Sequence, residues 1–98
     1  MAVDGMWNLT METPMGERTS TLQAKTEGAT LTGQQSAEGN STAIYDGAVS
    51  GNDVAWKIDI DQPMAMTLEF TGAVDGDKMT GSVKLGMFGT SSFSASRA

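Results

Sequence analysis

The 98-residue sequence contains no cysteine and no histidine. Without cysteine, no disulfide can stabilise the chain, and no thiol can act as a nucleophile or metal ligand. Without histidine, the chain lacks the side chain that most often serves as an acid or base near neutral pH, and the commonest metal ligand. A catalytic Ser–His arrangement is therefore excluded.

Basic residues are also scarce. The chain has 6 basic and 12 acidic residues, giving a formal net charge of −6. An acidic surface without a basic patch repels phosphate backbones, so we expect neither a nucleic acid nor an anionic membrane as a partner. The longest apolar run is far shorter than the roughly 18 residues that a membrane-spanning helix needs, so we expect no membrane insertion.

Turn-forming residues, by contrast, recur at regular intervals. Glycine and asparagine tolerate positive φ and proline presets φ, so each cluster suits a tight reversal of the chain. Regular reversals of this kind are typical of β-sandwiches and β-barrels. The clusters are Pro14–Gly16, Glu27–Gly28, Glu38–Asn40, Ser50–Asn52, Gln62–Pro63, Asp75–Asp77 and Gly86–Gly89.

Between the turns, apolar and polar residues alternate with the period of a half-buried strand. The pattern is clearest from Val54 to Asp61 and weakest from Arg18 to Val49, where the orientation of Tyr45 is open. The predicted inward residues are Trp7, Leu9, Met11, Leu22, Ala24, Leu31, Ile44, Val54, Trp56, Ile58, Ile60, Met66, Leu68, Phe70, Met79, Gly81, Val83, Leu85, Phe93 and Ala95.

We therefore predict a single all-β domain over residues 1–98, an antiparallel up-and-down meander of about eight short strands. Closing the meander into a barrel removes the two exposed edges that an open sheet would leave. Glycines within strands often mark barrel corners, and four positions fit that role: Gly33, Gly47, Gly72 and Gly81.

Two short features carry a family resemblance. Gly5-Met6-Trp7 in the first strand, together with Arg97 in the last, resembles the calycin superfamily of barrels, which includes lipocalins, fatty-acid-binding proteins and avidins. The resemblance implies that Trp7 packs across one end of the barrel and that Arg97 covers it, an arrangement that gains cation–π energy. The wider pattern of turns and core positions resembles a small bacterial lipocalin-like domain that also occurs as an accessory domain after larger secreted enzymes.

Two functions follow as expectations. The first is a non-catalytic accessory or interaction module that contacts a protein partner or a second copy of the chain. Apolar residues at turns, where turn geometry does not require them, are the candidate contacts, because exposed apolar patches often mark contact surfaces. They are Met15, Met64, Met87 and Phe88.

The alternative is a carrier of a small apolar ligand inside the barrel. Methionine adapts to irregular apolar space, and an eight-stranded barrel is just wide enough to be filled by side chains or to hold one small ligand. The candidate lining residues are Tyr45, Trp56, Met66, Phe70 and Met79. We rank the module ahead, because short strands leave little room inside.

We expect no enzymatic activity, no cofactor and no metal site. Asp59 and Asp61 share the polar face of a strand, and Asp75 and Asp77 flank a turn glycine, so solvated charge and turn chemistry account for both pairs. Met1–Asp4 lacks a basic segment followed by an apolar core, so it is not a signal peptide. We favour removal of a leader or upstream domain, which would fit a secreted or periplasmic protein, over a short native N-terminus.

Overall fold

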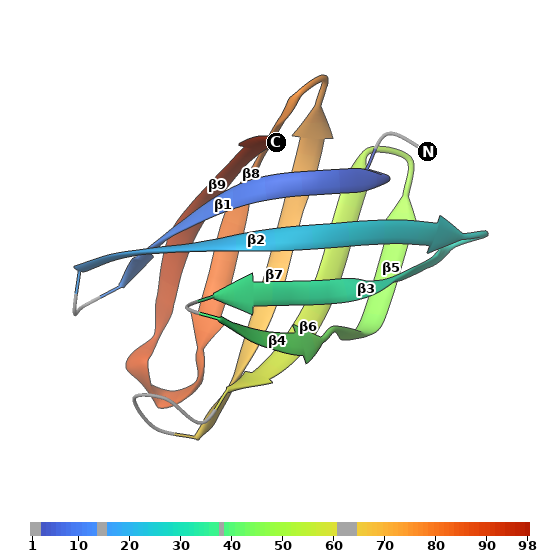
Figure 1. The fold of residues 1–98 in the computed structure, drawn as a ribbon. Coiled ribbons are helices and arrows are strands. Elements are labelled where there is room, and N and C mark those ends of the chain that lie inside the picture. Colours follow the sequence, from blue (N-terminus) through green and yellow to red (C-terminus); the bar gives the residue numbers. More distant parts are fainter. Residues whose placement is uncertain (1–2, 14–15, 38, 61–64) are drawn as a thin grey trace.

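The computed structural model describes residues 3–13, 16–37, 39–60 and 65–98. All regular structure in this part is β-strand except for one short 3-10 turn (Figure 1), and no helix in it is long and apolar enough to cross a membrane. The elements are β1 (Gly5–Thr13), β2 (Gly16–Glu27), β3 (Thr30–Ala37), β4 (Asn40–Ala43), β5 (Tyr45–Ser50), β6 (Asp53–Ile60), β7 (Met66–Asp75), β8 (Lys78–Leu85), η1 (Gly86–Phe88) and β9 (Thr90–Arg97).

The strands form a closed antiparallel meander. Consecutive strands pair with each other except β4 and β5, which both pair with β3, and β1 also pairs with β9, which joins the first strand to the last. β4 and β5 share one position beside β3, so the barrel has eight strand positions, as the spacing of the turns predicted. Figure 1 shows β1 to β4 crossing in front of the steeper β5 to β9, so the barrel is flattened into two crossed layers.

A β-bulge lies near the start of β5. The β5–β6 register shifts between Tyr45 and Ala48, and Asp46 has a φ of 50°. The extra residue moves the inward side chains from the even position Ile44 to the odd position Val49. Tyr45 follows the inward Ile44, faces outward and is 39% exposed, so the condition on which it was a candidate ligand contact, that it faces into the barrel, is not met.

The core follows the predicted alternation. Sixteen of the twenty residues predicted to face inward belong to the buried core cluster; Met11, Ile60 and Met66 pack against it half-buried, and Gly81 is half-buried in the wall. The full set of buried apolar residues also contains Val3, Val49 and Val74. Met11, Ile60 and Met66 lie at or near the ends of strands, at the opposite end of the barrel from Trp7.

Glycines allow close approach between neighbouring strands. A Cβ atom at Gly33 would lie 1.8 Å from the carbonyl oxygen of Gln23, and one at Gly81 would lie 2.0 Å from that of Thr71. Real Cβ atoms do not come so near a backbone oxygen, so no other residue fits without moving a strand. These positions lie within paired strands and allow the wall to bend sharply, as expected of barrel corners.

Candidate functional site

One end of the barrel is closed by a tryptophan and an arginine. Trp7 is fully buried in β1 and pairs in register with Arg97 of β9. The guanidinium carbon of Arg97 lies 4.4 Å from the centroid of the Trp7 ring. The cation therefore covers an apolar face that would otherwise meet water, a contact worth about 0.5–2 kcal/mol.

The N-terminal residues complete this closure. The Trp7 indole N–H donates to the carbonyl oxygen of Val3 at 2.9 Å, and Val3 itself is 1% exposed. Arg97 donates through Nη1 to the carbonyl oxygen of Asp4 at 2.7 Å. The Asp4 carboxylate accepts the backbone N–H and the hydroxyl of Thr26, both at 2.8 Å, and these bonds lower the pKa of Asp4. Sequence reasoning missed Val3, because a lone apolar residue before the first strand forms no periodic pattern.

Aromatic side chains occupy the interior. Trp56 and Phe70 stack with their ring centroids 4.8 Å apart and their planes 8° from parallel. Phe93 meets both rings edge-on, at centroid distances of 5.8 and 5.3 Å. Trp56, Phe70 and Met79, which were proposed to line a ligand pocket, are each at most 1% exposed and pack together as core. Of the other predicted lining residues, Met66 is half-buried at the rim and Tyr45 lies outside.

A buried polar pair also lies inside the barrel. Gln35 is 6% exposed, and its side-chain oxygen accepts the indole N–H of Trp56 at 3.2 Å. The Gln35 amide nitrogen donates to the hydroxyl of Ser20 at 3.0 Å. Sequence reasoning missed Gln35 because it is polar, although its alternation with Leu31 could have placed it on the inner face. Its hydrogen bonds fix the Trp56 ring, since an unmet N–H inside the barrel would be costly.

A second polar network lies on the outer face of β5, β6 and β7. Asp59 accepts the Tyr45 hydroxyl at 2.7 Å and the Thr67 hydroxyl at 2.8 Å. The bond from Tyr45, followed by that from Thr67, lowers the pKa of Asp59, and the bond to Asp59 raises the pKa of Tyr45. Lys57 bridges Asp46 at 3.6 Å and Glu69 at 3.8 Å on the same face.

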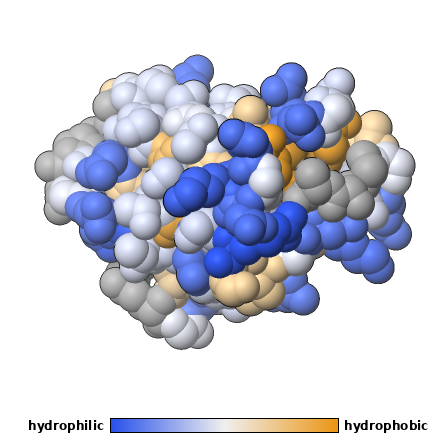
Figure 2. Space-filling model, turned by 90° about the horizontal axis from the view of Figure 1, so that it is seen from above, coloured by the Kyte–Doolittle hydropathy of each residue, from blue (hydrophilic) through white to orange (hydrophobic). Residues whose placement is uncertain are grey.

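The surface is mostly polar. Figure 2 shows hydrophilic residues over most of the face seen from above, with apolar residues in small separate patches. Two shallow depressions on the described surface lie on the outer wall, one over β1, β2 and the end of β3, the other over β1 to β4. Both open to solvent, and neither reaches the aromatic interior.

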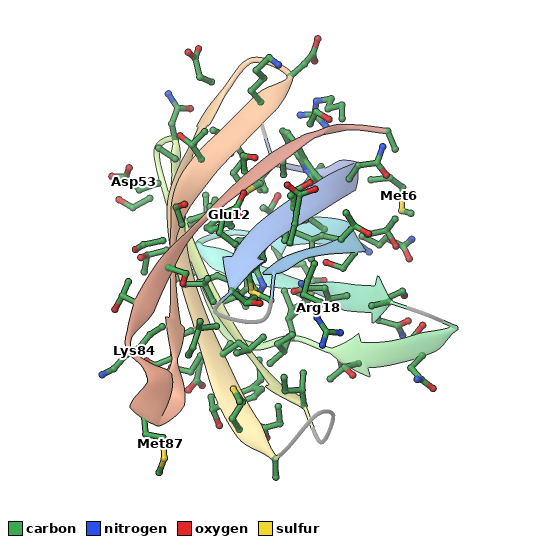
Figure 3. All side chains as sticks on the ribbon, turned by 90° about the vertical axis from the view of Figure 1, so that its left-hand side faces the viewer. Met6, Glu12, Arg18, Asp53, Lys84 and Met87 are labelled. Atoms are coloured by element: carbon green, nitrogen blue, oxygen red, sulfur yellow. The ribbon has the colours of Figure 1, made fainter. Side chains whose placement is uncertain are left out.

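Met87 is the most exposed large apolar side chain in the described part of the chain, at 93%. It sits in η1, between Gly86 at a φ of 58° and Gly89 at a φ of 90°, and the Leu85 N–H donates to the Gly89 carbonyl oxygen at 2.7 Å. Figure 3 shows it projecting from the bottom of the molecule, far from Met6 on the right-hand side.

The other predicted contact residues are only partly covered. Met15 and Met64 lie outside the described residues, and for Phe88 the structure describes the backbone alone. Within the described ranges, no three acidic, histidine or cysteine side chains gather as metal ligands would. Asp77, one of the paired turn carboxylates, instead bridges Arg97 at 3.4 Å.

Comparison with known proteins supports the fold. No protein-family model matches the sequence, and no curated protein matches it. One similar solved structure is that of a redesigned beta barrel, with a TM-score of 0.72 and 11% sequence identity over 99% of this chain and 92% of that one. The chain is thus an eight-stranded antiparallel β-barrel. At 11% sequence identity, the similarity supports the fold and nothing about function.

Proposed function

We propose that this barrel is a non-catalytic protein-contact module with a calycin-like closed end, and that Met87 is its central contact. The observation that carries the proposal is the 93% exposure of Met87 on a turn braced by two glycines of positive φ. Burying such a side chain in an apolar pocket should gain about 1.5–3 kcal/mol, from which its lost rotamer freedom is subtracted. Met87 is therefore suited to enter an apolar pocket of a partner.

The filled interior favours this function over ligand transport. Three aromatic rings contact one another inside the barrel, and Gln35 accepts a hydrogen bond from the indole N–H of Trp56. An interior ligand would have to displace this packed cluster, whereas a partner at Met87 would displace only water. We therefore prefer the protein-contact module to the carrier of an apolar ligand.

The charge of the chain favours a basic partner over a second copy. Two copies would bring two net charges of −6 together, and such self-repulsion keeps proteins apart. A partner with a positively charged surface around an apolar pocket would be attracted at long range and held by Met87 at short range.

Two exposed methionines provide a matched test. A photoreactive residue at position 87 should crosslink one defined protein in the cells that make the chain, and the same residue at Met6, which is 45% exposed, should not. Calorimetry with the purified partner should then show binding about tenfold or more weaker for Met87→Ser and unchanged for Met6→Ser. Equal crosslinking from the two sites, or equal affinity of Met87→Ser and the wild type, would contradict the proposal.

Sedimentation velocity tests whether the chain associates with a second copy of itself. We expect the chain alone to remain monomeric as its concentration rises. A dimer that Met87→Ser dissociates would show that the occupant is a second copy rather than a basic partner.

A further inference from the structure

The barrel wall is incomplete along one edge of β4. β4 pairs with β3 through residues 40 to 43, whereas the β5–β6 ladder ends at the pair Tyr45–Lys57. Among the described residues, no strand pairs with the other edge of β4. Figure 1 shows β4 running along β3 and at a wide angle to β6.

The direction of the backbone groups on this edge follows from one hydrogen bond. The Ile44 N–H donates to the Gly33 carbonyl oxygen at 3.0 Å, so Ile44 directs its polar backbone groups towards β3. Bonding direction alternates along an antiparallel strand, so Thr42 does the same, and Ser41 and Ala43 direct theirs away from β3. Ser41 and Ala43 are both exposed, so water solvates these groups in the free chain.

The edge is held in place before anything binds. The hydroxyls of Ser36 and Ser41 lie 2.8 Å apart across the β3–β4 pair, and Gly39 turns the hairpin at a φ of 83°. The chain then enters β5, and β4 contacts β6 without pairing with it, so the backbone groups on this edge have no strand partner among the described residues. An extended backbone could bind this edge with little rearrangement, and strand addition of this kind is a common mode of peptide recognition.

The side chains beside the edge define what would bind. Thr42 is half-buried and Ile44 buried on the inner side, which favours apolar side chains at alternate positions of an added strand. On the outer side, the nearest acidic residue of β6 is Asp59. Tyr45 pairs with Lys57, and continuing that antiparallel register by two positions would place Asp59 opposite Ala43. Asp59 is ionised at neutral pH, as aspartate ordinarily is, and its hydrogen bonds from Tyr45 and Thr67 lower its pKa further.

We propose that the free edge of β4 is a strand-addition site for an extended peptide segment of a partner protein, with apolar residues facing inward and basic residues facing outward. The site is separate from the Met87 turn, and it rests on backbone geometry rather than on an exposed apolar side chain. A second copy of β4 would fit the same backbone pattern, but it would add no basic residues and would bring a second net charge of −6.

The probe is a capped peptide of seven alternating valine and lysine residues, and its control is the same peptide with alternate backbone nitrogens methylated. In the free protein, the amides of Ser41 and Ala43 should exchange with solvent much faster than those of Thr42 and Ile44. Addition of the peptide should slow exchange at Ser41 and Ala43, and the methylated peptide should not. A peptide of alternating valine and glutamate should bind more weakly than the lysine peptide.

Matched substitutions at Ala43 test the edge from the side of the protein. Ala43→Pro removes the N–H that faces outward and leaves the ladder to β3 intact, as proline can at an edge strand. Ala43→Thr keeps that N–H. We expect the lysine peptide to bind about tenfold or more weakly to Ala43→Pro and within about twofold of wild type to Ala43→Thr and Met87→Ser.

Four results would overturn the proposal. The first is protection of the Ser41 and Ala43 amides in the dilute free protein, which would show that the edge is already paired. The second is protection that grows with protein concentration alone, which would identify a second copy. The third is equal binding of the plain and methylated peptides, and the fourth is unchanged peptide binding to an Ala43→Pro variant that keeps wild-type amide protection in β1 and β9.

Discussion

Replacing Arg97 with alanine removes at least three contacts at the closed end of the barrel. The cation–π contact with the buried Trp7 ring, at 4.4 Å, should contribute about 1 kcal/mol. The charged hydrogen bond to the Asp4 carbonyl oxygen, at 2.7 Å, should contribute about 1.5 kcal/mol. The ion pair with Asp77 adds only about 0–0.5 kcal/mol, because that carboxylate is 86% exposed. The expected loss of unfolding free energy is therefore about 2–3 kcal/mol.

Urea unfolding followed by tryptophan fluorescence measures this loss. With a slope of about 1–2 kcal/mol per molar for a small domain, the midpoint should fall by about 1–3 M. Asp77→Asn should cost less than about 0.5 kcal/mol, and so should Arg18→Ala, which removes an arginine exposed on β2. A midpoint for Arg97→Ala within error of the wild type would refute the closure role. A loss for Asp77→Asn equal to that for Arg97→Ala would assign the effect to the ion pair instead.

Three further variants test other parts of the structure. Gly81→Ala should cost about 3 kcal/mol or more by urea unfolding, because its Cβ would lie 2.0 Å from a facing carbonyl oxygen; a loss near zero would show that the wall yields there. Trp56→Phe should cost about 1 kcal/mol less in a Gln35→Leu background than in the wild type, because the glutamine oxygen then loses no partner, and strictly additive losses would contradict their hydrogen bond. Since the fold favours ionised Asp59 and neutral Tyr45, their pair stabilises it at intermediate pH; this contribution is lost as pH falls through the lowered pKa of the acid and as it rises through the raised pKa of the phenol. In an ultraviolet titration the phenol should therefore ionise above its ordinary range, and Asp59→Asn should bring it back; an unchanged titration would rule out the bond.

Much of the fold follows from patterns that are local in the sequence. Each turn cluster in the described residues lies between two strands, and the clear alternation from Val54 to Ile60 places the same residues inside that the structure buries or half-buries. These signals are strong because a one-residue slip would turn a whole strand inside out. The glycine corners could also be predicted, since a glycine within a strand loses packing and needs a reason to be there.

The sites were harder to predict. The bulge at Asp46 reverses the inward parity within a few residues, and although Gly47 follows it, a glycine within a strand does not distinguish a bulge from a corner, so Tyr45 could not be oriented. Gln35 can be buried because it has two partners on other strands, Ser20 and Trp56, which lie 15 and 21 residues away in the chain. Such contacts depend on how distant strands meet, and alternation within one strand carries no information about them.

The closed end also bears on the kinetics of folding. The bond from Arg97 to Asp4 joins residues 93 positions apart, whereas each hairpin joins neighbouring strands. Loop-closure entropy must be overcome before such a distant contact contributes, so the seam between β1 and β9 should form after the hairpins, beyond the transition state. Contacts made that late slow unfolding and leave the folding rate unchanged. This seam should therefore determine how long the folded barrel persists more than how quickly it is reached.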